Sequence, residues 1–477
     1  MKKESRKTLI NVPAKTFLQV TALLFGLLIL SIVLTYLIPA GTFGTLADGT
    51  PDYLDYQPLP ERGGIPIWKG LLAPVLVFAS SDGLTLLILS LFLFVIAGAF
   101  QVMNDAGGIK AIVSAVSSRF RERRTLLVLL VSFLFYCFGA FLGLFEEVLT
   151  LLPIVTALMI FIGYDSFTGF LVCIISCGFG FAGAITNPFT VLLASEIIGV
   201  NPMLHISFRI LIFFVMFALL MGFVFLYIRR IQKDPAASMT FAHDEELRAA
   251  GNADAALEGF SGGRGRVIRV YAAFLLIALA LIIGCSLISA VRSYTVVVLL
   301  AYFLIFGILT GILAGGKPKA VLKSFVNGFL GALPTMVFIA LAACVKYVLE
   351  EGSVLPTMVH SINQLIAGHS PILVALIIYL IVLLLEFFIS SSTAKAILVM
   401  GLLAMLSTGL TKEMLVLLYT FGDGYTNVIF PTSPVLLISL SMIHLDYFKW
   451  VKKSLPLFLV NVLLVILFIV LGVVLGY

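Results

Sequence analysis

Residues 385–406 read LEFFISSSTAKAILVMGLLAML, an apolar segment that is interrupted by Glu386, by the Ser390–Thr393 run and by Lys395. Polar and charged side chains are expensive in hydrocarbon, so they usually line a site or a water-filled path. Bent backbone at membrane depth is tolerated only where it is buried in protein or faces water. The segment therefore predicts a re-entrant hairpin rather than a clean membrane span.

A second segment of the same kind lies 240 positions earlier in the chain. Residues 144–162 read LFEEVLTLLPIVTALMIFI, and Glu146 occupies the position that corresponds to Glu386. The same offset maps Thr186–Asn187 onto Thr426–Asn427. Paired, interrupted hydrophobic segments at matching places in two halves are typical of secondary transporters. The chain is therefore predicted to contain two related halves, each with a hairpin and a broken helix.

The charges of the loops predict that the two halves have inverted topology. Upstream of the hairpins, an offset of 245 maps Asp105 onto Glu350. Asp105 precedes an arginine cluster at residues 119–124, which indicates a cytoplasmic position by the positive-inside rule. Glu350 precedes residues 353–369, which contain no Lys or Arg and therefore indicate an external position. One motif on opposite sides of the membrane means that the halves are inverted.

The composition is that of a polytopic membrane protein. Mean hydropathy is +1.16, with 61% hydrophobic and 11% charged residues, whereas about a quarter of a soluble domain is charged. Apolar runs of spanning length recur along the chain, so we expect an all-α fold with about 10–12 spans in a lipid bilayer. The net charge of +6 reflects basic cytoplasmic loops and not nucleic-acid binding. The N-terminal cluster Lys2, Lys3, Arg6 and Lys7 predicts a cytoplasmic N-terminus.

Spans, loops and charge divide the chain into five segments. We expect an N-terminal span and external loop at residues 1–67, and a first transport repeat at residues 68–230. A polar segment at residues 231–266 is predicted to be a cytoplasmic linker, either flexible or partly helical. Two connecting spans follow at residues 267–316, and a second transport repeat occupies residues 317–477.

Gly and Pro interrupt the helices beside both Thr-Asn pairs, which predicts an ion site. Breaks of this kind free backbone carbonyls and expose half-helix ends that can hold ions. Hard cations prefer oxygen ligands, and a buried carboxylate can instead take up a proton. The alternative is that the Thr and Asn side chains cap the broken helices locally. The predicted sodium or proton site comprises Thr186, Asn187, Thr190, Glu386, Asp423, Thr426 and Asn427.

An overlapping set of polar residues is predicted to bind the substrate. Lys395 could anchor a carboxylate, could take the place that a cation fills in the other half, or could form an internal ion pair with Glu386 or Asp423. The hydroxyls of the Ser390–Thr393 run could bind a carboxylate at a helix start, or could only cap that helix. The predicted substrate-binding residues are Glu146, Asn187, Ser390, Ser391, Ser392, Thr393, Lys395, Asn427 and Thr432.

These features predict a secondary active transporter that works by alternating access. It would couple a small organic acid or amino acid to sodium or protons, as a symporter or an antiporter, without any other cofactor. The rival prediction is a passive channel. An enzyme is disfavoured, because the five histidines form no His-Glu-x-x-His set, and direct ATP drive is disfavoured, because no phosphate-binding P-loop is visible. Arg209 and Lys449 are expected to mark span ends, with head groups that reach toward water.

At these residues the chain resembles the YfcC family, which is grouped with the four-carbon dicarboxylate anaerobic carriers of the ion transporter superfamily. The family often has a Ser-Gly-Ser-Gly-Lys-Ala stretch where residues 390–396 here read SSSTAKA. The resemblance implies a transporter of dicarboxylates, or of basic amino acids in exchange. It also implies a bacterial inner-membrane location, inverted repeats with two hairpins, and a homodimer. The matching stretches lie at residues 38–41, 146–147 with 153, 163–165 with 168–169, 186–189, 421–424, 426–427 and 431–433.

Overall fold

Helices long enough to cross a membrane dominate the chain. The computed structural model describes residues 14–46, 51–60, 63–120, 123–252, 263–292, 294–366, 368–406 and 408–477. Within these ranges, nine helical segments are long and apolar enough to span a bilayer, and four shorter apolar helices accompany them. The predicted α-helical membrane fold is confirmed.

A small β-hairpin is the one element that the all-α prediction did not include. It follows α1 (Ala14–Leu37) and consists of β1 (Gly41–Thr45) and β2 (Pro51–Pro58), which pair in antiparallel fashion. Phe43 and Tyr53 pack edge to face across it, with ring centroids 5.0 Å apart. Aromatic and β-branched residues favour strands, and this density of them was overlooked in a predicted loop. The short helical turns α2 (Ile67–Leu71), α3 (Ala73–Leu76) and η1 (Val77–Ala79) complete the segment.

The first half runs through a hairpin and a broken helix. Its hairpin has α6 as one arm and α7 as the other, and the chain reverses at Gly143, where φ is +67°. The predicted hairpin at residues 144–162 is thus only the tip and the returning arm. The elements are α4 (Gly83–Asp105), α5 (Gly108–Phe120), α6 (Arg124–Cys137), η2 (Phe138–Leu142), η3 (Glu147–Thr150), α7 (Leu152–Phe161), α8 (Ser166–Phe170), η4 (Leu171–Ile175), α9 (Ser176–Ala182), η5 (Pro188–Leu192), α10 (Leu193–Ile198) and α11 (Ile206–Lys233).

The second half repeats the same order of elements. Its hairpin consists of α19 and α20, joined by a turn at residues 389–391, so the predicted hairpin at residues 385–406 is again the tip and the returning arm. The second broken helix is formed by α21, η7 and α22. The elements are α16 (Pro318–Gly331), α17 (Pro334–Glu351), α18 (Leu355–Ile366), α19 (Pro371–Phe388), α20 (Ser392–Met405), α21 (Lys412–Gly424), η7 (Tyr425–Val428), α22 (Pro434–Met442) and α23 (Tyr447–Leu475).

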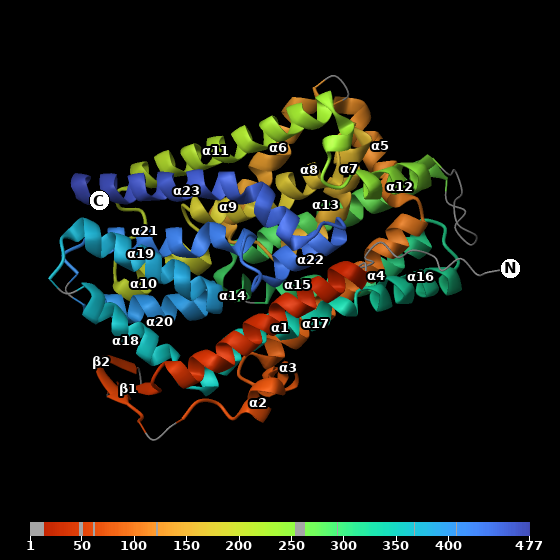
Figure 1. The fold of residues 1–477 in the computed structure, drawn as a ribbon. Coiled ribbons are helices and arrows are strands. Elements are labelled where there is room, and N and C mark those ends of the chain that lie inside the picture. The colour runs from red at the N-terminus through yellow and green to blue at the C-terminus, as the bar shows by residue number, and fades with distance from the viewer. Residues whose placement is uncertain are drawn as a thin grey trace.

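Corresponding helices of the two halves run antiparallel. At the start of α11, the Phe208 ring lies 4.8 Å from the ring of Tyr477, which follows α23. At the other end of α11, the Tyr227 ring lies 5.3 Å from the ammonium group of Lys453 near the start of α23. Figure 1 shows the two helices side by side in opposite directions. This is the relation that inverted repeats require.

The helices α4 and α17 show the same antiparallel relation. Ser324, on α16, donates a hydrogen bond of 2.6 Å to Asp105 at the end of α4. Lys346, near the end of α17, forms a 2.6 Å ion pair with Asp82, directly before α4. The end of α4 thus meets α16, and its beginning meets the end of α17.

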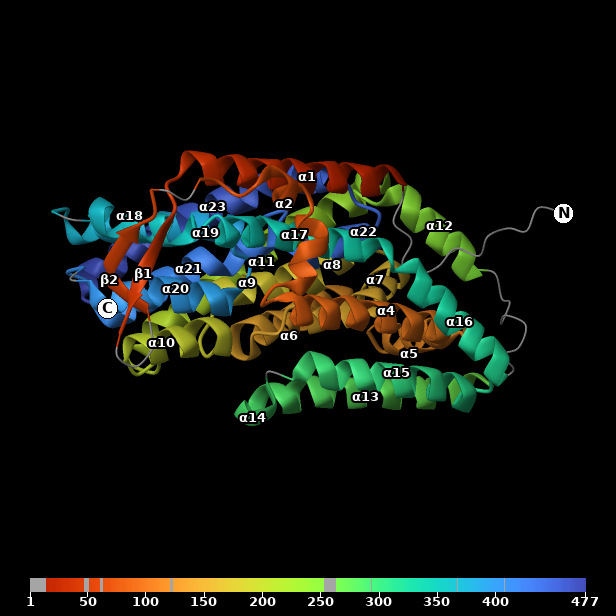
Figure 2. The same ribbon diagram turned by 90° about the horizontal axis from the view of Figure 1, so that it is seen from below.

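The segment between the halves contains a docked helix and a separate helical pair. Helices α13 (Arg264–Leu287) and α15 (Thr295–Leu313), joined by α14 (Ser289–Arg292), lie together at one side of the bundle (Figure 2). Within the predicted linker, η6 (Pro235–Ala237) and α12 (Phe241–Asn252) are helical. Asp244 on α12 accepts a 3.0 Å hydrogen bond from the backbone of Ser166, at the start of α8. Residues 253–262 and the N-terminal cluster at residues 2–7 lie outside the described part of the chain.

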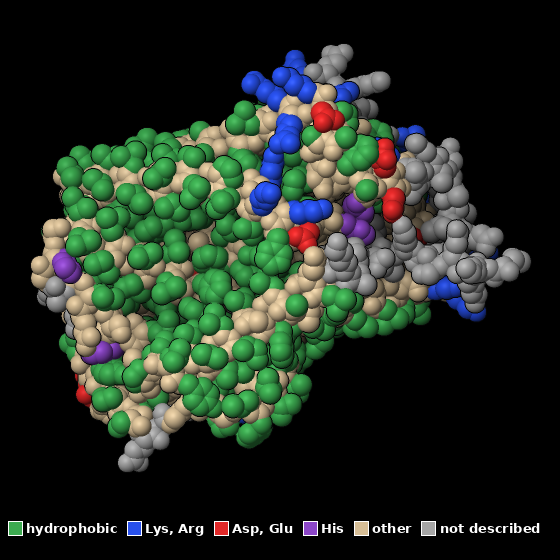
Figure 3. Space-filling view, viewed as in Figure 1, with side chains coloured by type: hydrophobic (Ala, Val, Ile, Leu, Met, Phe, Trp, Pro, Cys, Tyr) green, Lys and Arg blue, Asp and Glu red, His purple; other side chains and the backbone are tan. Residues whose placement is uncertain are grey.

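The surface agrees with a membrane location. Figure 3 shows a face that is hydrophobic over most of its extent, with Lys and Arg side chains gathered toward one end. Exposed large apolar side chains occur along α1, α11, α15 and α23, including Leu18, Phe214, Ile305 and Leu463. In water such a surface would be unfavourable, whereas in lipid it costs nothing.

Candidate functional site

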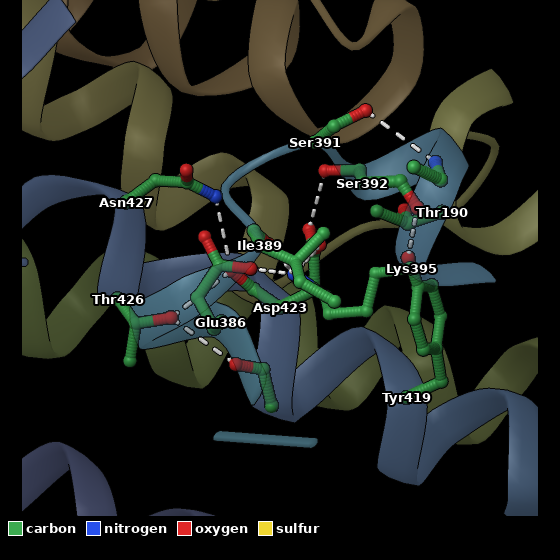
Figure 4. A network of polar contacts seen from close by, with 12 residues as sticks. Thr190, Glu386, Ile389, Ser391, Ser392, Lys395, Tyr419, Asp423, Thr426 and Asn427 are labelled. Atoms are coloured by element: carbon green, nitrogen blue, oxygen red, sulfur yellow. Dashed lines mark hydrogen bonds and ion pairs between the residues drawn. The ribbon is translucent and has the colours of Figure 1, made fainter. Parts of the chain in front are cut away.

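Lys395 lies at the centre of a buried charged cluster. Its ammonium group is 2.7 Å from a carboxylate oxygen of Asp423 and also forms an ion pair with Glu386. It donates a further hydrogen bond of 3.3 Å to the carbonyl of Ile389. Ser392 donates to the other oxygen of Asp423 at 2.9 Å. We call Glu386, Ser392, Lys395 and Asp423 the Lys395 cluster (Figure 4).

Broken and bent elements bring the Lys395 cluster together. Glu386 lies near the end of α19, Lys395 in the first turn of α20 and Asp423 near the end of α21. The side chains of Glu386 and Lys395 are 1% and 0% exposed, and that of Asp423 is 0% exposed. With all three groups ionised, one negative charge is in excess. A buried excess charge is costly, so the cluster favours an additional positive charge, either a metal cation or a proton.

The serine run divides between the cluster and the helix cap. Ser392 joins the cluster, and its carbonyl accepts a hydrogen bond from the Tyr419 hydroxyl. Ser391 accepts from the backbone of Ala394 and is the N-cap of α20. Thr393 is exposed, and Ser390, in the turn, is half-buried. The capping alternative therefore describes Ser391, while Ser392 is the hydroxyl that contacts the charges.

The second broken helix holds its polar side chains against its own backbone. Asn427 donates a 3.0 Å hydrogen bond to the carbonyl of Asp423. Thr426 donates to the carbonyls of Gly422 and Asp423, at 3.1 and 3.2 Å. These bonds stabilise the backbone that presents the Asp423 carboxylate. Thr432 is 2% exposed, and its hydroxyl has no hydrogen-bond partner among the described residues.

The first broken helix contributes Thr190 to the neighbourhood of the Lys395 cluster. Its π-helical segment η5 packs against both α20 and α21. Figure 4 places Thr190 beside Ser392 and Tyr419. Thr190 is fully buried, and its hydroxyl has no hydrogen-bond partner within the described ranges. This hydroxyl is therefore an available oxygen ligand next to the cluster.

Asn187 serves as a local cap and a tie to the first hairpin. Its carbonyl oxygen accepts from the backbone of Phe189 and Thr190, at 2.9 and 3.2 Å, and its amide donates to Gly139 at 2.8 Å. Thr186 donates to the carbonyl of Phe141 at 3.2 Å. Asn187 thus caps the broken helix locally, and the Thr-Asn pair also joins this helix to the tip of the hairpin.

The two acidic residues at the tip of the first hairpin, Glu146 and Glu147, are not part of the Lys395 cluster. Glu146 is half-buried, whereas Glu147 is the more buried of the two at 8% exposed. One carboxylate oxygen of Glu147 has no hydrogen-bond partner in the described part of the chain. Neither residue forms an ion pair with a described Lys or Arg. The symmetry in sequence therefore does not extend to a second charged cluster.

Arg209 is a polar residue of the core that the sequence interpretation missed. We expected it to reach water at a span end, but it is 3% exposed. Its guanidinium donates a 3.5 Å hydrogen bond to the carbonyl of Ala184, which lies in the break between α9 and η5 of the first broken helix. Its counterpart Lys449 is exposed, as expected. Two residues that align in sequence thus have different surroundings, a difference that a pattern of charge and hydropathy does not reveal.

No transition-metal centre accompanies these groups. Among the described residues, no set of three or more His, Cys, Asp and Glu side chains is arranged to hold a metal ion. The oxygens around Lys395 are instead of the kind that a hard monovalent cation prefers. They come from two carboxylates, one hydroxyl and one backbone carbonyl.

The chain is similar to known proteins in sequence and in structure. The chain is 29% identical over 378 residues to "Putative basic amino acid antiporter YfcC" of Escherichia coli (strain K12), covering 76% of this chain and 72% of that protein. It is 25% identical over 372 residues to an uncharacterized protein of Haemophilus influenzae, covering 77% and 71%. The solved YdaH transporter of Alcanivorax borkumensis aligns with 96% of this chain and 99% of its own, at 16% identity and a TM-score of 0.43.

A family model gives the assignment. The model for DcuC, described as C4-dicarboxylate anaerobic carrier, matches residues 17–474, which is nearly the whole chain. The match includes both hairpins, both broken helices and every residue of the Lys395 cluster. This polytopic membrane protein therefore belongs to the C4-dicarboxylate anaerobic carrier family of transporters.

Proposed function

We propose that the protein is a secondary active transporter in which the Lys395 cluster binds the coupling cation. The observation that carries this proposal is the excess negative charge of Glu386 and Asp423 over Lys395, enclosed at the meeting point of a hairpin and a broken helix. Both elements are interrupted at the Lys395 cluster, so a small rotation of either element would change the arrangement of the oxygen atoms in the cluster. Ion binding would then be linked to the conformation of the hairpin.

We propose that the ion bound by the Lys395 cluster is either sodium or a proton. A sodium ion would use the carboxylate, hydroxyl and carbonyl oxygens that now surround the Lys395 ammonium group, together with the nearby Thr190 hydroxyl. A proton would neutralise Glu386 or Asp423 and leave a balanced ion pair. Either event removes the excess charge and stabilises the closed site.

For the substrate we propose a small amino acid or organic acid, with a basic amino acid favoured. The excess negative charge of the cluster would attract the cationic part of such a molecule, and would repel a dicarboxylate unless a cation accompanied it. The name of the Escherichia coli relative points to basic amino acids, and the family name points to four-carbon dicarboxylates. We place the protein in a bacterial inner membrane with its N-terminus in the cytoplasm, and propose a homodimer.

Counterflow in proteoliposomes tests this function. Vesicles are loaded with unlabelled arginine, ornithine or succinate, and uptake of the labelled compound is followed with and without sodium and at two pH values. A carrier gives uptake that is stimulated by the same compound inside and that depends on one of the two ions. Uptake that only equilibrates, without stimulation from inside, would show a passive channel and contradict the proposal.

A matched pair of variants tests the ion site. Glu386→Gln removes the excess charge, so we expect coupled uptake to fall by at least tenfold and to lose most of its ion dependence. Glu196→Gln makes the same chemical change at an exposed position on α10 and should behave like the wild type. Unchanged ion dependence in Glu386→Gln would remove this residue from the site.

A further inference from the structure

Arg209 is a buried cation in the membrane-embedded part of the protein. It lies in the first turn of α11, and only 3% of its surface is exposed. A long basic side chain near the end of a span normally reaches outward to water. Here the guanidinium turns instead toward the break between α9 and η5 in the first broken helix, where it contacts the Ala184 carbonyl.

The partners of Arg209 do not balance its charge. The bond to Ala184 is long, at 3.5 Å, and a guanidinium offers five N–H donors. The Tyr477 hydroxyl lies nearby, but burial raises the pKa of Tyr477, so that hydroxyl stays neutral. No carboxylate of the described residues forms an ion pair with Arg209. A buried, unpaired guanidinium is strongly unfavourable unless an anion accompanies it.

The position of Arg209 connects it to the Lys395 cluster. Ala184 lies in the break between α9 and η5, two residues after Ala182. A Cβ built on Gly424 would lie 2.6 Å from the backbone of Ala182, so the two broken helices are in direct contact there. Gly424 immediately follows Asp423. The break that Arg209 contacts and the segment that carries Asp423 therefore belong to two broken helices that touch at Ala182 and Gly424.

We propose that Arg209 binds the carboxylate of the transported substrate. The planar guanidinium matches a carboxylate with two parallel hydrogen bonds, which a single ammonium group cannot provide. The substrate would supply the missing counter-charge, and its opposite end would face the Lys395 cluster directly or through the coupling cation. This inference rests on the proposed transport of amino or organic acids, and it assigns the recognition of their shared carboxylate to one residue.

Two substrate pairs that differ only at the carboxylate test this assignment. Counterflow is measured for arginine against agmatine, and for succinate against succinamide, which has no carboxylate. The wild type should prefer the compound with the additional carboxylate by tenfold or more in the pair that it transports. In Arg209→Gln this preference should fall to about twofold or less, while uptake of the compound lacking that carboxylate stays within twofold of the wild type.

A binding measurement and two further variants distinguish recognition from a structural role. In detergent, the preferred compound should raise the melting temperature of the wild type but not of Arg209→Gln. Arg209→Lys keeps the positive charge but lacks the planar guanidinium that forms two parallel hydrogen bonds. This variant should retain the fold and lose most of the preference for the compound with the carboxylate. Glu413→Gln removes an acid that acts electrostatically on Tyr477 and should leave the preference intact, since we do not assign Glu413 as the counter-ion.

Three results would overturn the assignment. If Arg209→Gln and Arg209→Lys both fold and keep the wild-type preference, Arg209 does not bind the carboxylate. If Glu413→Gln reproduces the loss, Glu413 is the counter-ion and Arg209 has a structural role. If the wild type exchanges none of the four compounds, the transport proposal fails and this assignment falls with it, a result that is distinct from a failure of the Arg209 variants alone.

Discussion

At the residue scale, side chains that are neighbours or counterparts in the sequence have different surroundings in the structure. Ser391 and Ser392 are adjacent, yet one caps a helix and the other contacts a buried carboxylate. Arg209 and Lys449 align between the halves, yet one is buried and the other exposed. A charge in the interior persists only where a partner compensates for it. The Lys395 cluster and Arg209 are therefore the positions where a single substitution has the largest consequence.

Removing Lys395 should destabilise the protein more than removing one of its acidic partners. Lys395→Met leaves two buried carboxylates close together, and loss of one partner of a buried ion pair typically costs about 3–5 kcal/mol. Asp423→Asn leaves the Lys395–Glu386 pair balanced and should fold nearly as well as the wild type. Thermal unfolding in detergent measures both. A melting temperature for Lys395→Met equal to that of Asp423→Asn would show that the cluster does not work as a charge-balanced unit.

At the element scale, close contact between the two broken helices positions the site. Helix α9 packs against α21 and η7, and Gly424 touches Ala182 with no room for a side chain. Since Asp423 precedes Gly424, this contact also sets the place of its carboxylate relative to the first broken helix. The hairpin α19–α20 then completes the cluster from the other side. The site exists only where three interrupted elements meet.

Gly424→Ala should disturb this contact. The added Cβ would lie 2.6 Å from backbone atoms of Ala182, and the surrounding helices are buried and cannot yield cheaply. Overpacking of this kind costs about 1–3 kcal/mol, so we expect a lower melting temperature and at least a tenfold loss of uptake.

Gly222→Ala provides the matched control for that change. Gly222 lies inside α11, and a Cβ there meets nothing within 4 Å. Alanine is the better helix former, so this variant should be neutral or stabilised by about 0.5–1 kcal/mol. Equal melting temperatures and uptake for the two variants would show that the contact of Gly424 with Ala182 is not constrained.

At the scale of the whole molecule, the antiparallel relation of the halves predicts which ends face the same side. Thr411, directly before α21, donates to the Tyr477 carbonyl, and Tyr477 packs against Phe208 at the start of α11. Lys412 should therefore be external if the end of α11 is cytoplasmic. Lys233 closes α11 at the opposite end. Inverted repeats thus make the two lysines report on opposite faces of the membrane.

Cysteine labelling tests this topology. In intact cells, a membrane-impermeant maleimide should label Lys412→Cys, and should label Lys233→Cys only after permeabilisation. The native cysteines give a low background, because Cys173, Cys177, Cys285 and Cys344 are buried and Cys137 is half-buried. Labelling of both introduced cysteines from the same side would contradict the inverted arrangement.

The sequence alone determined the membrane fold, the two hairpins, the broken helices and the family. Hydropathy, interruptions by Gly, Pro and polar residues, and a repeated spacing are local properties, and they predict where a helix spans, bends or breaks. The sequence also raised an ion pair of Lys395 with Glu386 or Asp423 as one of three roles for that lysine, because a buried lysine needs a carboxylate nearby.

Only the tertiary structure decided which polar residues meet. In the structure, Lys395 forms an ion pair and Asn187 caps a helix. Thr190 lies beside Ser392, and the Arg209 side chain points into the protein. The contacts of Lys395 with Asp423 and of Arg209 with Ala184 join residues more than 20 positions apart, and their geometry depends on how interrupted helices cross. Spacing along the chain carries no information about that crossing, since the packing of backbone against backbone, as at Gly424 and Ala182, sets it.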